Sequence, residues 1–190
     1  MENIIIEKAK KTDAAEIVRL ISLADKDAVL ALSGKNDIDD ALRQYEINFG
    51  REDIYFSYKN IFVARSNSRI LGCILYFRGE DESSFQPISE RPLELEMENE
   101  SDPDEIYIDS LAVLAVLPEC RGKGIAKRLV KQVTLEARKQ GFQKVGLLAD
   151  KSKAYLGSMY QTLGFNVTAE VSLLNDHYEK MTFYTEPSCS

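Results

Sequence analysis

The stretch "PECRGKGIAKRLV", residues 118–130, places two glycines one residue apart among basic side chains, where an apolar run ends. Apolar residues recur every four positions from Ile125, which predicts an amphipathic helix over 125–139. The first N–H groups of such a helix have no partner within it and lie at the positive end of its dipole. Glycine lacks the β-carbon that would keep an anion away from those groups. The stretch therefore predicts a phosphate or pyrophosphate site, to which Arg121 and Lys123 add positive charge.

Two familiar phosphate-binding motifs do not fit this stretch. A Walker loop needs Lys and then Ser or Thr after its last glycine, but Ile125 follows Gly124. A dinucleotide fingerprint needs glycine or alanine where Lys127 stands. A third pattern, [Q/R]-x-x-G-x-[G/A], is satisfied by Arg121, Gly124 and Ala126. The alternative without a ligand is a tight turn between strand and helix, and this stretch alone leaves it open.

Residue periodicity and turn signals predict a mixed α/β chain around this motif. The expected strands cover residues 3–8, the two arms of a hairpin over 61–79, a long run over 106–117, and 144–150, 167–174 and 180–186. The expected helices cover 12–24, 37–49, 125–139 and 152–163, with Ser152 as the cap of the last.

A second motif lies one helix and one strand further on. Residues 159–165 read "MYQTLGF". With Arg121-x-x-Gly124-x-Ala126, this segment resembles the GNAT superfamily of N-acyltransferases that use acyl-coenzyme A. The resemblance implies an α/β (α+β) fold, a single domain over 1–190 with a central mixed sheet flanked by helices. The sheet would be splayed between the strands at 106–117 and 144–149, with acyl-CoA in the opening.

The resemblance also implies which backbone groups hold the cofactor. The pyrophosphate would lie on the amides of Arg121, Gly122, Lys123, Gly124, Ile125 and Ala126. The pantetheine arm would pair, like an added strand, with Leu114, Ala115 and Val116. The tripeptide Leu-Ala-Val occurs twice over 111–116, which leaves open which copy lines the cofactor.

The implied reaction is transfer of an acetyl group from acetyl-CoA to a primary amine of a small molecule or peptide, by direct attack in a ternary complex. Tyr160 matches the tyrosine of the second motif and would protonate the departing thiolate. Strand geometry places Glu105 and Asp109 on one face, and either carboxylate could accept the proton of the amine, with Asp109 preferred. Structural roles for Tyr160 and both carboxylates stay open, as does a non-catalytic acyl-CoA-binding sensor module. Cys120 has no nearby base and is expected to be inert.

The amino-acid composition limits the kinds of partner that the protein could bind. The net charge of −7 argues against nucleic acid, and no apolar run is long enough for a membrane span. Three widely spaced cysteines and a single histidine, His177, argue against a metal site and favour the cytoplasm. Residues 80–105 contain eleven acidic residues and one basic residue, and form an acidic insertion that either keeps the protein soluble or attracts a cationic amine. The sequence does not decide between a monomer and a homodimer.

Overall fold

The structure is a computed structural model that describes residues 3–24, 26–87, 101–109, 114–173 and 176–185. These residues form one eight-stranded sheet with the order β1-β2-β3-β4-β6-β8-β7, and β5 pairs with β3 off this path. β4 and β6 are parallel, whereas the other pairs are antiparallel, so the predicted mixed sheet is confirmed. The strands are β1 (Ile4–Lys8), β2 (Ile61–Ser66), β3 (Arg69–Arg78), β4 (Glu105–Ile108), β5 (Leu114–Val116), β6 (Lys144–Asp150), β7 (Asn166–Leu173) and β8 (Asp176–Tyr184).

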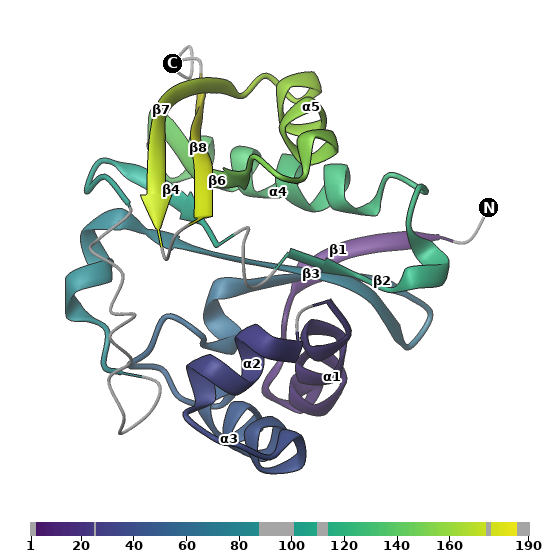
Figure 1. The fold of residues 1–190 in the computed structure, drawn as a ribbon. Helices are drawn as coiled ribbons and strands as arrows, with labels where there is room; N and C mark the ends of the chain where they lie inside the picture. The colour runs from purple at the N-terminus through teal and green to yellow at the C-terminus, as the bar shows by residue number, and fades with distance from the viewer. Residues whose placement is uncertain (1–2, 25, 88–100, 110–113, 174–175, 186–190) are drawn as a thin grey trace.

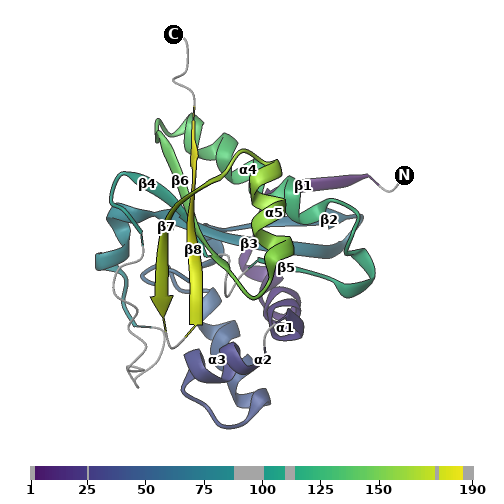
Figure 2. The ribbon, with the colours of Figure 1, turned by 45° about the horizontal axis from the view of Figure 1, so that its top comes forward.

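Helices cover both faces of the sheet (Figures 1 and 2). Three helices before β2 lie on one face, and α4 and α5 lie on the other. The helices are α1 (Ala14–Ala24), α2 (Lys26–Ser33), α3 (Ile38–Phe49), α4 (Ile125–Lys139) and α5 (Ala154–Thr162).

Alternation along the central strands builds a separate apolar core on each face. On β4, Tyr107 packs into the cluster formed with α1 and α3, whereas Ile106 and Ile108 pack with α4. On β3, Leu75 and Ile74 divide in the same way. The two faces of β4 therefore pack into different cores, as strand alternation requires.

The long strand expected over 106–117 is wrong as a single element. β3 pairs with β4 at Tyr76 and Ile108, and with β5 at Ile74 and Leu114. A shift of two residues along β3, from Tyr76 to Ile74, thus corresponds to a shift of six residues in its partner, from Ile108 to Leu114. In a continuous paired strand the two shifts would be equal. The second Leu-Ala-Val copy forms β5, while residues 110–113, with the first copy, lie outside the described residues.

Two smaller predictions also need correction. α2 was not predicted, because its eight residues follow α1 almost directly and lack a long apolar repeat. Ser152 does not cap α5: the helix begins after Lys153, and the Ser152 hydroxyl instead donates to Asp150 Oδ1 over 2.6 Å. Among the described residues, no helix is long and apolar enough to cross a membrane.

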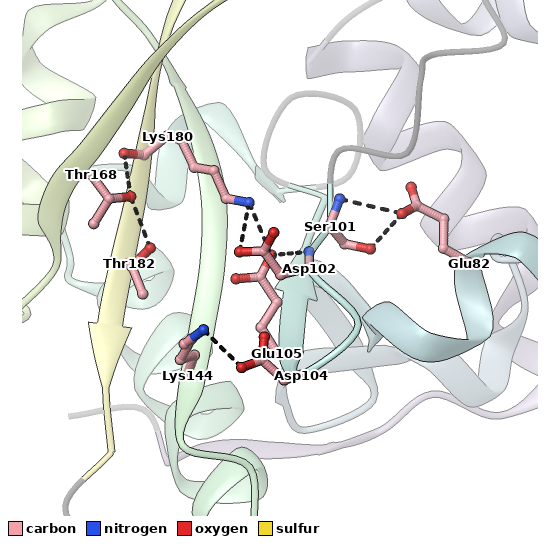
Figure 3. Close-up of polar contacts among 9 residues, drawn as sticks. All are labelled: Glu82, Ser101, Asp102, Asp104, Glu105, Lys144, Thr168, Lys180 and Thr182. Carbon is pink, nitrogen blue, oxygen red and sulfur yellow. Dashed lines mark hydrogen bonds and ion pairs between the residues drawn. The ribbon is translucent and has the colours of Figure 1, made fainter.

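The two described ends of the acidic insertion lie together. Glu82, in a 3₁₀ turn over Gly79–Ser84, accepts hydrogen bonds from the backbone N–H and the hydroxyl of Ser101 (Figure 3). The insertion therefore leaves and rejoins the sheet at nearly the same place. Residues 88–100, within the acidic insertion, lie outside the described part of the chain.

Candidate active site

The two glycines of the opening motif adopt the backbone conformation that only glycine adopts easily. Gly122 has a φ of 75° and Gly124 a φ of 76°, and a β-carbon on either would meet nothing within 4 Å. α4 begins at Ile125, with no side-chain cap and no acidic residue in its first turn, throughout a stretch that is fully described. The start of α4 therefore has no side-chain acceptor for its first N–H groups, and the two glycines before it leave open space for an anion.

Basic side chains surround this turn without filling it. Arg121, Lys123 and Lys127 are exposed. Arg121 Nε donates to the Val116 carbonyl oxygen over 3.3 Å, so that side chain bridges the turn and β5. Arg128 donates to the Ile4 carbonyl oxygen over 2.6 Å and thereby ties α4 to β1. Positive charge is thus available at the turn from three side chains, and a fourth has a structural role.

A third glycine, which the sequence did not single out, holds the turn in place. A β-carbon at Gly72 of β3 would lie 2.9 Å from the Ala115 carbonyl oxygen and 3.1 Å from Ile125 Cγ2. Both distances are shorter than van der Waals contact. Gly72 therefore lets β5 and the first residue of α4 pack directly against β3. No spacing rule in the sequence pointed to this role.

The sheet is splayed beside β5. One edge of β5 pairs with β3, while β6 pairs with β4 over Glu105–Ile108. Within the described ranges, β5 has no pairing with β6. The Leu117 N–H donates to the Leu71 carbonyl oxygen of β3. The Val116 carbonyl belongs to the same peptide group and therefore points away from β3, where it accepts from Arg121. The free edge of β5 can therefore pair with an extended ligand.

Tyr160 lies near the end of α5 and is completely buried, with 0% of its surface exposed. Its ring packs on Phe165 at a centroid distance of 5.9 Å, within the core beneath α4 and α5. The following Gly164 has a φ of 94°, as a helix end requires. The motif therefore folds as a tight helix stop that anchors the tyrosine. An acid role for Tyr160 stays a prediction.

Asp109 directly follows β4, at the point where the sheet opens. Its backbone N–H donates to the Leu75 oxygen over 3.1 Å, and its side chain is half-buried. The pKa of Tyr55 is raised, first by burial and then by the negative charge of Asp109. The Asp109 carboxylate therefore lies near the Tyr55 hydroxyl, on the face of the sheet that packs against α1 and α3.

A comparison with protein families gives a match to the acetyltransferase (GNAT) domain over residues 57–167, more than half of the chain. The chain belongs to the GNAT acetyltransferase family. The matched region contains both glycines, Asp109 and Tyr160, and it ends two residues after "MYQTLGF". No match was found among curated proteins.

Solved structures share the GNAT fold at low identity. An acetyltransferase structure is 22% identical over 96% of this chain and 100% of its own, with a TM-score of 0.81. An N-acetyltransferase from Staphylococcus aureus Mu50 is 24% identical, covers 94% and 99%, and has a TM-score of 0.78. A putative acetyltransferase from Salmonella typhimurium, solved with acetyl-CoA, is 18% identical over 99% and 97%, with a TM-score of 0.59.

Glu105, the second candidate base of this GNAT chain, occupies a different environment from Asp109. It is completely buried, and its Oε1 accepts from the Asp102 backbone N–H over 2.9 Å and lies 3.6 Å from Lys180 Nζ (Figure 3). Lys180 also pairs with Asp102 over 3.1 Å. Gly146 of β6 leaves room for the carboxylate, because a β-carbon there would lie 2.4 Å from Oε2. Burial and these contacts argue against Glu105 as the base.

We expect the burial of Glu105 to make the free energy of unfolding depend on pH. Burial raises the pKa of this carboxyl above 4.5. The folded protein therefore binds a proton on the Glu105 carboxyl more tightly than the unfolded chain does. The stabilisation that this protonation provides is lost as the pH rises from about 4.5 through the pKa of the folded protein. Glu105→Gln keeps the oxygen that accepts from Asp102 and removes the titration. The difference in unfolding free energy, wild type minus variant, should fall as the pH rises above about 4.5 in urea titrations.

Asp104→Asn is the control for that measurement. Asp104 is exposed, and its hydrogen bond with Lys144 lowers its pKa below 3.8. Its difference curve should therefore be flat over the same range. A Glu105→Gln difference that rises with pH would show that Lys180 outweighs burial.

The remaining nucleophile candidates are placed as expected for inert groups. Cys73 and Cys120 are buried, and burial raises the pKa of the Cys73 thiol to about 12. His177 is exposed, with Nδ1 3.0 Å from the Ser172 hydroxyl on the neighbouring strand β7. Within the described residues, no group of three or more His, Cys, Asp or Glu side chains could hold a metal ion.

Proposed function

We propose that this protein transfers an acetyl group from acetyl-CoA to a primary amine of a small molecule or peptide, by direct attack in a ternary complex. The observation that carries this proposal is that two open surfaces, the start of α4 and the free edge of β5, lie next to each other in the chain. The uncapped start of α4 follows β5 within the same short segment, and β5 has a free edge beside the splay. One ligand with a pyrophosphate and an extended amide arm would satisfy both.

In this proposal the chain itself binds and orients the cosubstrate. Amides from Gly122 to Ala126 hold the pyrophosphate, whereas the Arg121 N–H, which the sequence motif included, already donates to the Pro118 carbonyl oxygen over 3.2 Å. The groups of Leu114–Val116 on the free edge hold the pantetheine arm. Two similar folds support this: the Salmonella typhimurium protein was solved with acetyl-CoA, and the NatC complex, at a TM-score of 0.59 and 20% identity, with a Gag peptide and CoA. The proposed mechanism involves no metal. In the same proposal, residues 1–190 form a single domain that acts in the cytoplasm.

Two side chains carry the proton transfers. Asp109 accepts the proton of the attacking amine, directly or through water, since it lies where β4 ends and the splay begins. Tyr160 donates a proton to the thiolate that leaves. The half-buried position of Asp109 keeps it within reach of solvent, whereas the burial of Tyr160 requires the bound thioester to reach into the splay.

Asp109→Asn should separate base catalysis from cofactor binding. We expect kcat/KM for the amine to fall by about 10²-fold, because the amide cannot take up the proton, while the affinity for acetyl-CoA is unchanged. Steady-state kinetics and calorimetry measure the two quantities. Asp104→Asn, at the opposite end of β4, is the matched control and should behave as wild type. Equal losses in both variants would remove Asp109 from the mechanism.

The activity itself is tested in two steps. Mass spectrometry of the purified protein should find bound CoA, and thioester consumption should then depend on an added amine. The acidic insertion makes cationic amines the first members of the panel. A non-catalytic sensor would bind CoA and consume no thioester with any amine. Light scattering of the same sample distinguishes a monomer from a homodimer.

A further inference from the structure

The exposed side of α4 concentrates positive charge in an otherwise acidic chain. Residues 121–139 contain seven basic residues and one acidic residue, a formal charge of +6, whereas the whole chain carries −7. The basic residues of α4 itself are all exposed: Lys127, Arg128, Lys131, Arg138 and Lys139. Leu135 lies on the same side of the helix as Lys131 and Arg138, and 49% of its surface is exposed. α4 therefore presents a basic surface, formed by Lys127, Lys131, Arg138 and Lys139 around Leu135.

Within the described part of the chain, no carboxylate pairs with this basic surface. Ion pairs link basic residues of other elements to carboxylates, and none of them includes a residue of α4. Glu136, the acidic residue of the helix, accepts a hydrogen bond from Gln140 over 2.8 Å. Lys127 and Lys131 lie four residues apart, a spacing at which like charges on a helix repel each other. An anionic partner would relieve this repulsion.

The chain itself contains a segment of opposite charge, the acidic insertion over 80–105, with eleven acidic residues and one basic residue. Its outgoing end is held on the face of the sheet that packs against α1 and α3. Phe85 packs against that core, with its ring 5.4 Å from the ring of Phe77. The next residue, Gln86, donates its N–H to the Asp53 carbonyl oxygen over 2.8 Å, in the segment before β2. The insertion therefore starts on the side of the sheet away from α4 (Figures 1 and 2).

The returning end of the insertion is held on the same side. Asp102 pairs with Lys180 over 3.1 Å, and Lys180 also lies 3.6 Å from Glu105 (Figure 3). Strand alternation places Glu105 on the face of β4 that carries Tyr107, which packs with α1 and α3. Both described ends thus lie on the side opposite α4. The insertion can therefore reach the basic surface of another molecule more directly than that of its own chain.

We propose that the basic surface of α4 is an interaction surface for a second copy of this protein and binds the acidic insertion of that copy. Because insertion and α4 lie on opposite sides of the sheet, the contact is head to tail and has no two-fold symmetry. Opposite charges favour and orient the contact, so it is strong at low salt and weak at high salt. The proposal uses no catalytic residue and does not rest on the proposed acetyl transfer.

The first test measures association of the full chain as a function of salt. Sedimentation velocity at about 0.01 M ionic strength, where the Debye length is about 30 Å, should give an average mass above that of one chain. This mass should rise with protein concentration. At about 1 M salt, where the Debye length is about 3 Å, the association constant should fall by about 100-fold or more. A wild-type protein that stays monomeric at low salt overturns the proposal.

The second test reverses three charges of the basic surface, with the changes Lys131→Glu, Arg138→Glu and Lys139→Glu. Like charges would then face each other, so the association constant at low salt should fall by about 100-fold or more. Urea unfolding verifies that this α4 variant is folded. The matched control makes the same change of net charge at exposed residues outside α4: Lys10→Glu, Arg19→Glu and Lys35→Glu. The control should associate as the wild type does. Equal losses in both would assign the effect to net charge and overturn the proposal.

The third test identifies the partner of the basic surface. An insertion variant reverses four charges of the acidic segment: Glu94→Lys, Glu96→Lys, Glu98→Lys and Glu100→Lys. It should be monomeric alone, because its insertion and its α4 are then both positive. Mixed in equal amounts, the α4 variant and the insertion variant should associate as strongly as the wild type, since each insertion then meets an α4 of opposite charge. A mixture that stays monomeric would show that the insertion does not bind α4 of another molecule, and would overturn the proposal.

Discussion

Gly124→Val is expected to abolish the binding of acetyl-CoA while the protein stays folded. Gly124 has a φ of 76°, a conformation in which a β-branched side chain is strained by roughly 1–2 kcal/mol. The turn would relax toward negative φ and turn the amides at the start of α4 away from their common focus. The new side chain would also occupy the open space above them. We expect calorimetry to show an affinity loss of about 100-fold or more.

Gly141→Val is a matched control for that experiment. Gly141 also has a positive φ, 84°, and a β-carbon there would meet nothing within 4 Å. It follows the C-terminal end of α4, however, where carbonyl oxygens and not N–H groups lack partners. Both variants should lose similar stability in urea unfolding, and only Gly124→Val should lose affinity. Equal acetyl-CoA affinity in wild type and Gly124→Val would refute the pyrophosphate site.

The elements that local patterns decide were predictable from the sequence. The apolar repeat from Ile125 predicted α4 with its observed bounds. The pattern over 37–49 predicted α3, which begins at Ile38; Asp37 caps it, and its side chain accepts from the N–H groups of Asp39 and Asp40. In these segments the apolar periodicity agrees with the packing, so tertiary contacts had nothing to override.

The parts that depend on distant residues were not predictable. The break between β4 and β5 follows from the register against β3, which a single strand pattern does not reveal. The role of Gly72 arises only where β5 and α4 meet, and the burial of Glu105 depends on Gly146 and Lys180. Sequence spacing likewise gave Tyr160 a motif position but not its complete burial. Each of these features joins residues from different strands or helices.

The burial of Tyr160 makes its replacement by phenylalanine a sharp test. Tyr160→Phe keeps the ring that packs on Phe165 and removes only the hydroxyl, so the fold should be retained. If the hydroxyl protonates the leaving thiolate, kcat should fall by about 10²-fold or more, whereas acetyl-CoA affinity should hardly change. Single-turnover kinetics must first show that chemistry limits the rate. The pH dependence of kcat should then lose its alkaline limb, because that limb reports the acid in the ternary complex.

Tyr155→Phe separates this effect from a general sensitivity of α5. Tyr155 lies on the same helix, but 69% of its surface is exposed, so loss of its hydroxyl should leave kcat and stability unchanged. A hydroxyl that acts only in packing would give Tyr160→Phe a lower stability with unchanged kcat per folded molecule. A catalytic hydroxyl gives the reverse, a loss of kcat with stability changed by about 1 kcal/mol or less. Unchanged kcat, with chemistry limiting, would assign Tyr160 to the core and leave the thiolate to be protonated by solvent.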